Sequence, residues 1–149
     1  MPSPKFMPAF TRALFDSDLI ASRISLAIAE FAWATMLFWP GDSFARPTYT
    51  LMAHVAVEEV WAAVFLLSAV TQISIVAMED FNSSLARYFA GWNAALWGYT
   101  VASMLLSVYP PPAAIGGEIA LAFSAAWIWL RPFILIEGYR RAARATNVL

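Results

Sequence analysis

The chain has 149 residues and a formal net charge of −1 at pH 7, and 61% of its residues are hydrophobic while only 13% are charged. This composition, with its positive mean hydropathy, is typical of integral membrane proteins, and the small net charge argues against a nucleic-acid partner. The sequence contains no cysteine, which excludes disulfides, thiolate metal sites and cysteine nucleophiles.

Four apolar segments follow one another along the chain, and each has at least the roughly 20 residues that a helix needs to cross a bilayer. They cover residues 19–39, 50–78, 87–108 and 113–136. Polar or proline-rich stretches separate them, as expected for turns. We therefore expect one membrane domain over residues 1–149 with an all-α fold, a bundle of four transmembrane helices. Residues 1–18 are expected to form an amphipathic lead-in, and residues 139–149 a basic exposed tail.

Basic residues are distributed unevenly between the two sides of such a bundle. Four spans return the chain to its starting side, so both termini lie on the same side of the membrane. That side collects Lys5, Arg12, Arg23, Arg87, Arg131, Arg140, Arg141 and Arg144. The opposite side has Arg46 alone. Because basic residues accumulate on the cytoplasmic side of membrane proteins, we expect a multi-pass inner-membrane protein with both termini in the cytoplasm.

The second span, residues 50–78, is the segment in which polar residues are most regularly placed. If it is one helix, its polar and aromatic residues form a single stripe at helical spacing. The stripe consists of His54, Glu58, Trp61, Phe65, Ser68 and Gln72, with Glu59 to one side. Lipid does not tolerate such a stripe, so we expect it to face other helices or a wet cavity.

Acidic residues at membrane depth are the strongest candidates for a site. Counted inward from the outer ends of their spans, Glu30 and Glu58 both lie about 12–14 Å deep at helical rise. We expect them to approach one another, with His54 and Glu118 on the outer side of the same cavity. Such a group of carboxylates and an imidazole suits a divalent metal or a proton. The alternative for His54 and Glu58 is a structural hydrogen bond that specifies helix packing.

The arginines near the inner boundary have two interpretations. Arg23 and Arg131 either extend their side chains toward the headgroups or bind a substrate or a lipid phosphate. The basic tail is expected to fix topology, with binding of anionic lipid as a secondary effect. Its arginines are Arg140, Arg141 and Arg144.

Enzymatic signatures are missing from the sequence. It contains no Gly-x-Ser-x-Gly elbow, phosphate-binding loop, dinucleotide fingerprint or His-Glu-x-x-His motif, and a single histidine excludes bis-histidine haem. The sequence does leave open one enzymatic activity, hydrolysis by a pair of carboxylates. We expect a protein that is not an enzyme and that has no cofactor beyond a divalent metal at the acidic cluster.

Residues 44–52, Phe-Ala-Arg-Pro-Thr-Tyr-Thr-Leu-Met, and residues 57–61, Val-Glu-Glu-Val-Trp, carry a resemblance. With the four-span layout, they resemble small membrane proteins encoded in tailed-phage genomes. That group includes holins, which assemble in the inner membrane and permeabilise it. The resemblance implies a homo-oligomer in the lipid bilayer that permeabilises or modifies the membrane. We favour this function for the chain, and the alternative is a small transporter or ion-binding protein that uses the acidic cluster.

Overall fold

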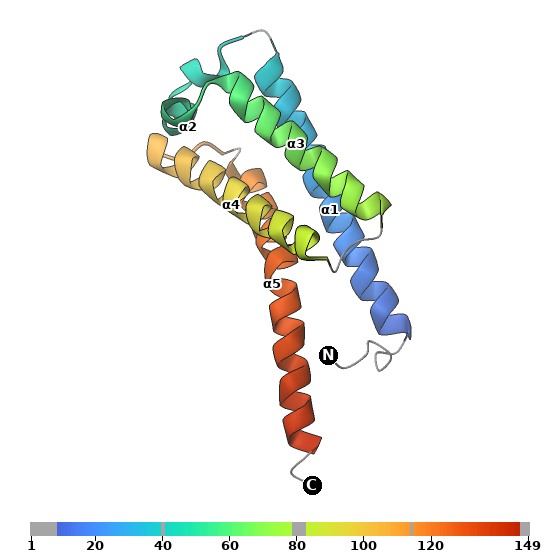
Figure 1. Cartoon of the computed structure of the whole chain (residues 1–149). Coiled ribbons are helices and arrows are strands. Elements are labelled where there is room, and N and C mark those ends of the chain that lie inside the picture. Colours follow the sequence, from blue (N-terminus) through green and yellow to red (C-terminus); the bar gives the residue numbers. More distant parts are fainter. Residues whose placement is uncertain (1–8, 40, 79–82, 114, 147–149) are drawn as a thin grey trace.

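The computed structural model describes residues 9–39, 41–78, 83–113 and 115–146, and this part of the chain is helical without strands. Figure 1 shows four long helices and a compact connection after the first of them. The long helices are α1 (Ala9–Phe38), α3 (Glu58–Ala77), α4 (Ser84–Ser107) and α5 (Ile115–Thr146). The connection contains η2 (Ser43–Ala45), η3 (Pro47–Tyr49) and α2 (Thr50–Val55). The expected all-α class is confirmed for the described residues.

The long helices form two pairs, α1 with α3 and α4 with α5 (Figure 1). Successive long helices run in opposite directions, so both ends of the chain lie at the same end of the molecule. We call that the terminal end, and we call the opposite end, with η2, η3 and α2, the loop end. Every long helix therefore passes between the same two ends.

Three of the helices in the described chain are long and apolar enough to cross a membrane. The segments are Asp18–Phe38, Glu58–Ala77 and Ile115–Leu135. The expected helix at 87–108 is present as α4, but it is less apolar than the other three. Its polar residues Asn93, Thr100 and Ser103 are buried in the protein rather than turned toward its surroundings. That α4 crosses the membrane thus stays a prediction. The polar residues of α4 are explained by their burial inside the protein.

The expectation of one continuous helix over residues 50–78 is wrong. Ala56 and Val57 are extended, with ψ angles of 162° and 160°, and they separate α2 from α3. The break places Glu58 and Glu59 in the first turn of α3, where negative charge is favoured by the helix dipole. These two residues therefore lie at the end of a span and not one-third of the way along it.

The last helix also extends further than expected, into the segment predicted to be a basic exposed tail. The helix does not stop near residue 136 but continues through Pro132 to Thr146. One proline removes a single backbone donor, and the residues after it are mostly strong helix formers such as glutamate, arginine and alanine. The amino-terminal lead-in is likewise helical from Ala9 onward, while residues 1–8 lie outside the described residues.

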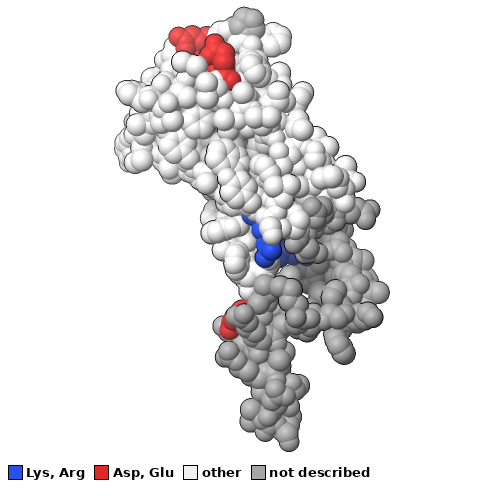
Figure 2. All heavy atoms as spheres, in the orientation of Figure 1, with Lys and Arg blue, Asp and Glu red and all other residues white. Residues whose placement is uncertain are grey.

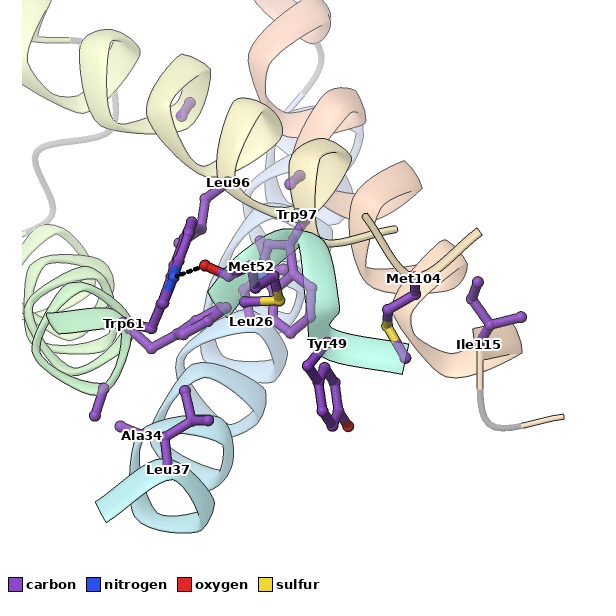
Figure 3. Packing of buried hydrophobic residues seen from close by; sticks show 14 of the residues in the cluster. Leu26, Ala34, Leu37, Tyr49, Met52, Trp61, Leu96, Trp97, Met104 and Ile115 are labelled. Atoms are coloured by element: carbon purple, nitrogen blue, oxygen red, sulfur yellow. Dashed lines mark hydrogen bonds between the residues drawn. The ribbon is translucent and has the colours of Figure 1, made fainter. Parts of the chain in front are cut away.

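The apolar core is richest where α1, α3 and α4 meet the loop-end connection. Figure 3 shows Trp97, Leu26 and Met52 within this cluster of buried side chains. Trp61 Nε1 donates a hydrogen bond of 3.0 Å to the backbone oxygen of Met52, which ties α3 to α2. Tyr99 stacks on Trp61 at a ring-centroid distance of 5.5 Å. The hydrogen bond holds α2 against α3, and the ring contact holds α3 against α4.

Candidate functional site

Glu30 is the acidic side chain that the structure buries completely, with 0% of its surface exposed. It lies near the middle of the Asp18–Phe38 segment of α1. Its Oε1 accepts a hydrogen bond of 3.2 Å from Trp97 Nε1 on α4, and Ser68 on α3 lies beside the same carboxyl group. Its Oε2 is buried and has no hydrogen-bond partner among the described residues. Glu30 is thus a half-satisfied carboxyl group at mid-span.

The neighbours of Glu30 join three helices at one level. Ser68 donates a hydrogen bond to Asn93 Oδ1, which links the middle of α3 to the middle of α4. Trp97 links α4 to α1 through Glu30. Buried polar groups at mid-membrane depth are costly unless they are paired. We therefore expect this cluster to have a structural or a functional role.

Arg23 forms a second buried polar contact on the terminal side of Glu30. Its guanidinium donates from Nη1 to Gln72 Oε1 at 2.5 Å and from Nη2 to the backbone oxygen of Ala86 at 3.4 Å. The side chain is only 2% exposed, so it does not extend toward the headgroups as expected. Arg23 Nε and Gln72 Nε2 have no hydrogen-bond partner in the described chain. Arg131 on α5 is also buried, with 8% of its surface exposed.

Three aromatic rings lie on the loop side of Glu30. Trp33 is one turn beyond Glu30 on α1, while Phe65 and Trp97 come from α3 and α4. The ring centroids are 5.3 Å apart for Trp33 and Phe65, 5.5 Å for Phe65 and Trp97, and 6.1 Å for Trp33 and Trp97. We call these three residues the ring cluster. Glu30 therefore has polar side chains toward the terminal end and aromatic rings toward the loop end.

The predicted group of Glu30, His54, Glu58 and Glu118 is not formed. Glu58 accepts a hydrogen bond from the backbone N–H of Phe44 at the loop end, far along α3 from Ser68. His54 is exposed on α2, with Nδ1 2.6 Å from the backbone oxygen of Thr50.

Within the described residues, no three histidine or acidic side chains are grouped to hold a metal ion. The expected shared cavity of Glu30 and Glu58 is thus wrong. The expected depth of Glu58 requires an unbroken helix over residues 50–78. The break at Ala56 instead places Glu58 in the first turn of α3.

Glu118 lies in the first turn of α5, at the loop end and near Tyr49. Burial raises the pKa of Tyr49 above its usual value, the negative charge of Glu118 raises it further, and Arg46 opposes the shift. Glu118 Oε2 is itself buried without a hydrogen-bond partner in the part of the chain described. Glu118 therefore belongs to the packing of the loop end, away from Glu30.

Charged residues of both signs occur along the long axis of the molecule. Figure 2 shows acidic side chains over the loop end, basic side chains further toward the terminal end, and another acidic group beyond these. The backbone of the predicted basic tail belongs to α5, but its arginine side chains lie outside the described residues. These are Arg140, Arg141 and Arg144.

Sequence reasoning found some of the site and missed its central contact. The helical stripe predicted that Ser68 and Gln72 face the interior, and both are buried. Trp97 as the partner of Glu30 was missed, because an indole N–H counts as apolar in a hydropathy pattern. No signal in the sequence distinguishes this tryptophan from the other six.

Comparison of the chain with protein-family models, with curated proteins and with solved structures finds no match. The resemblance to phage membrane proteins stays a prediction. The function is therefore argued from the geometry of the site.

Proposed function

We propose that the chain is a small four-span inner-membrane protein that binds a proton at Glu30 and transports protons, alone or coupled to a solute. This is the transporter and ion-binding hypothesis, with the proton as the ion and Glu30 in place of the larger acidic cluster. The observation that carries the proposal is one carboxyl group, fully buried at mid-span with Oε2 unpartnered. Ionisable residues inside membrane spans are costly, and they commonly mark ion or proton pathways.

The contacts of Glu30 suit reversible protonation. Trp97 donates to Oε1, which leaves Oε2 as the atom that gains or loses the proton. A proton arriving on a water molecule forms the O–H bond at Oε2 and leaves neutral water behind, and the reverse step regenerates the carboxylate. The Trp97 N–H that holds Oε1 need not move during this exchange. Glu30 can therefore gain or lose one charge without breaking its contact to Trp97.

The proposed topology rests on charge and composition. Among the described arginine side chains, Arg23, Arg87 and Arg131 lie toward the terminal end, and Arg46 lies at the loop end. This distribution favours a cytoplasmic terminal end. Fusion of a sidedness reporter after Ala45 and, separately, after Ser84 should give opposite locations if α3 crosses the membrane. The same location for both would contradict the four-span topology.

Proton flux into liposomes tests the function directly. The purified protein is reconstituted with a pH-sensitive dye inside, and a potassium gradient with valinomycin supplies the membrane potential. We expect inward proton flux from the wild-type chain and only the flux of empty liposomes from Glu30→Gln, which keeps the side-chain volume but cannot exchange a proton. Glu59→Gln is the matched control, because Glu59 is exposed at the start of α3. Equal flux from the wild-type chain and Glu30→Gln would contradict the proposal.

Oligomeric permeabilisation is the second proposal, as the resemblance to phage membrane proteins implies. Its support is the exposure of α5. In the most apolar part of each helix, 33% of residues in α1 and 39% in α3 are buried, against 17% in α5. Phe123 and Phe133 of α5 are 73% and 58% exposed. Release of a trapped dye from the same liposomes, unchanged in Glu30→Gln, would favour this second function over proton transport.

A further inference from the structure

We propose that bound water joins Glu30 to the terminal end of the molecule, and that the ring cluster closes the loop side, so that Glu30 exchanges protons with one side of the membrane only. The inference rests on the proposed function, since it specifies the direction of access to the same carboxyl group. It describes the arrangement of the helices in this structure, and transport then requires a second arrangement in which Glu30 is open to the loop side. The carrying observation is the difference between the two sides of Glu30.

The terminal side of Glu30 has buried polar atoms that lack a hydrogen-bond partner in the described chain. Arg23 Nε and Gln72 Nε2 are buried donors without a partner in the described chain, and Glu30 Oε2 is a buried acceptor in the same condition. Arg23 lies two turns of α1 from Glu30, about 10 Å at helical rise, and Gln72 lies one turn of α3 from Ser68. Buried water typically binds where such groups would otherwise stay unsatisfied, and it makes two to four hydrogen bonds. A short file of water molecules between these groups would satisfy all three.

On the loop side of Glu30, aromatic rings separate the carboxyl group from the next unpartnered buried polar atom of the described residues, Glu118 Oε2 in the first turn of α5. The next residues inward on the three helices are Trp33, Phe65 and Trp97, whose ring centroids lie 5.3–6.1 Å apart. Phe65 and Trp97 are fully buried. The Trp97 N–H, the one polar group of the ring cluster known to face the site, is already bonded to Glu30. Rings in direct contact leave little room for water and offer it no hydrogen-bond partner.

The charged residues around Glu30 agree with this direction. On α1 the nearest charged residue is Arg23, on the terminal side. The buried residues of α3 and α4 near Glu30 are uncharged, and the acidic pair Glu58 and Glu59 lies at the loop end of α3. On α5 the buried charge is Arg131, toward the terminal end. Apart from Glu30, the buried charged residues of the described chain are therefore the two arginines, and both lie toward the terminal end.

Accessibility of single cysteines tests the route, because the natural chain has no cysteine. Ala27 and Ala34 are a matched pair on the Glu30 face of α1, one turn to either side of it, with exposures of 1% and 2%. Each is changed separately, as Ala27→Cys and Ala34→Cys. The probe is the silver ion, which is small, binds thiolates and does not cross lipid. It is added to membrane vesicles of either orientation, and thiols that remain free are then counted with a maleimide after denaturation.

We expect silver to protect Ala27→Cys when it is added from the terminal side and not from the loop side. Ala34→Cys should stay unprotected from both sides, because it lies level with the ring cluster. Ala45→Cys in the loop and Ser84→Cys at the start of α4 report that each side was reached. Adding Phe65→Ala to Ala34→Cys should open the ring cluster and allow protection.

The inference is overturned if Ala27→Cys is protected from the loop side, if it is unprotected from both sides, or if Ala34→Cys is protected without Phe65→Ala. If either buried alanine does not tolerate cysteine, Ala69→Cys and Ala62→Cys on α3 repeat the comparison, since both alanines are buried and lie on opposite sides of Ser68. Proton flux without the labelling asymmetry would overturn the route alone. Asymmetric labelling without Glu30-dependent flux would overturn the proposed function and leave the water route standing.

Discussion

The two helix pairs differ in the buried acidic group. Both pairs bury polar residues and an arginine, with Arg23, Ser68 and Gln72 in α1 and α3 and Asn93, Thr100, Ser103 and Arg131 in α4 and α5, but the buried carboxyl group, Glu30, belongs to the first pair. In the second pair, Gly91 of α4 is so close to α5 that a Cβ atom there would lie 3.0 Å from Trp129 Nε1. Close approach through small residues is a common way to pack helices in lipid. The comparison indicates that the first pair carries the ionisable carboxyl group, while α4 packs closely on α5 and supplies partners to the first pair.

The first pair nevertheless depends on the second. Three of the polar groups that α1 and α3 bury have a partner on α4: Glu30 binds Trp97, Ser68 binds Asn93, and Arg23 reaches the backbone of Ala86. Arg23 and Gln72 also bind one another within the first pair, but Glu30 and Ser68 take these partners from α4. The seam between the pairs is therefore where the loss of one side chain should matter most.

The largest expected effect comes from Trp97. We expect Trp97→Ala to lower the free energy of unfolding by about 3–5 kcal/mol, because it leaves a large cavity and removes the donor to Glu30. Trp97→Phe retains most of the packing and should cost about 1–3 kcal/mol for the unsatisfied carboxyl oxygen. Denaturation of the protein in mixed micelles, followed by circular dichroism, measures both. Stability of Trp97→Phe equal to wild type would mean that the indole hydrogen bond contributes nothing.

A smaller effect separates two glycines of α4. Gly98→Ala meets no atom within 4 Å and should gain about 0.5–1 kcal/mol from the preference of alanine for helices. Gly91→Ala should lose this gain, because Trp129 must move away from the new methyl group. The melting temperatures of the two variants in one detergent give the comparison. Equal stabilisation by both would show that α4 and α5 are not held by close approach at Gly91.

The smallest effect contrasts two serines. Ser68 bonds across to Asn93, whereas Ser124 on α5 donates to the Ala120 oxygen of its own helix at 2.9 Å. Interhelical hydrogen bonds in membranes average about 0.6 kcal/mol, so Ser68→Ala should destabilise by about that amount, and Ser124→Ala should have almost no effect. The same denaturation experiment resolves the pair when replicate curves are compared. A larger loss for Ser124→Ala would contradict the assignment of the polar seam to α1, α3 and α4.

Hydrophobicity and breaker residues by themselves determined the helical membrane class and most of the helix limits. Apolar segments of spanning length predicted α1, α3, α4 and α5, because backbone groups in lipid must be satisfied within a helix. Pro40 and the prolines of residues 110–112 marked the turns after α1 and α4. Periodicity also predicted that Ser68 and Gln72 face the interior, since a polar stripe must avoid lipid.

Only the tertiary structure decided which groups meet. No proline or glycine in the sequence marks the break at Ala56. Contacts with residues earlier in the chain hold it: Trp61 binds the backbone of Met52, and Glu58 binds the N–H of Phe44. Without that break, Glu58 was placed beside Glu30 at a depth it does not have. A helical period specifies the face on which a side chain lies, but not the neighbour that the face will meet. For this reason the pairing of Glu30 with Trp97 and the burial of Arg23 follow from the packing of α4 against the first helix pair, and not from the pattern of any one helix.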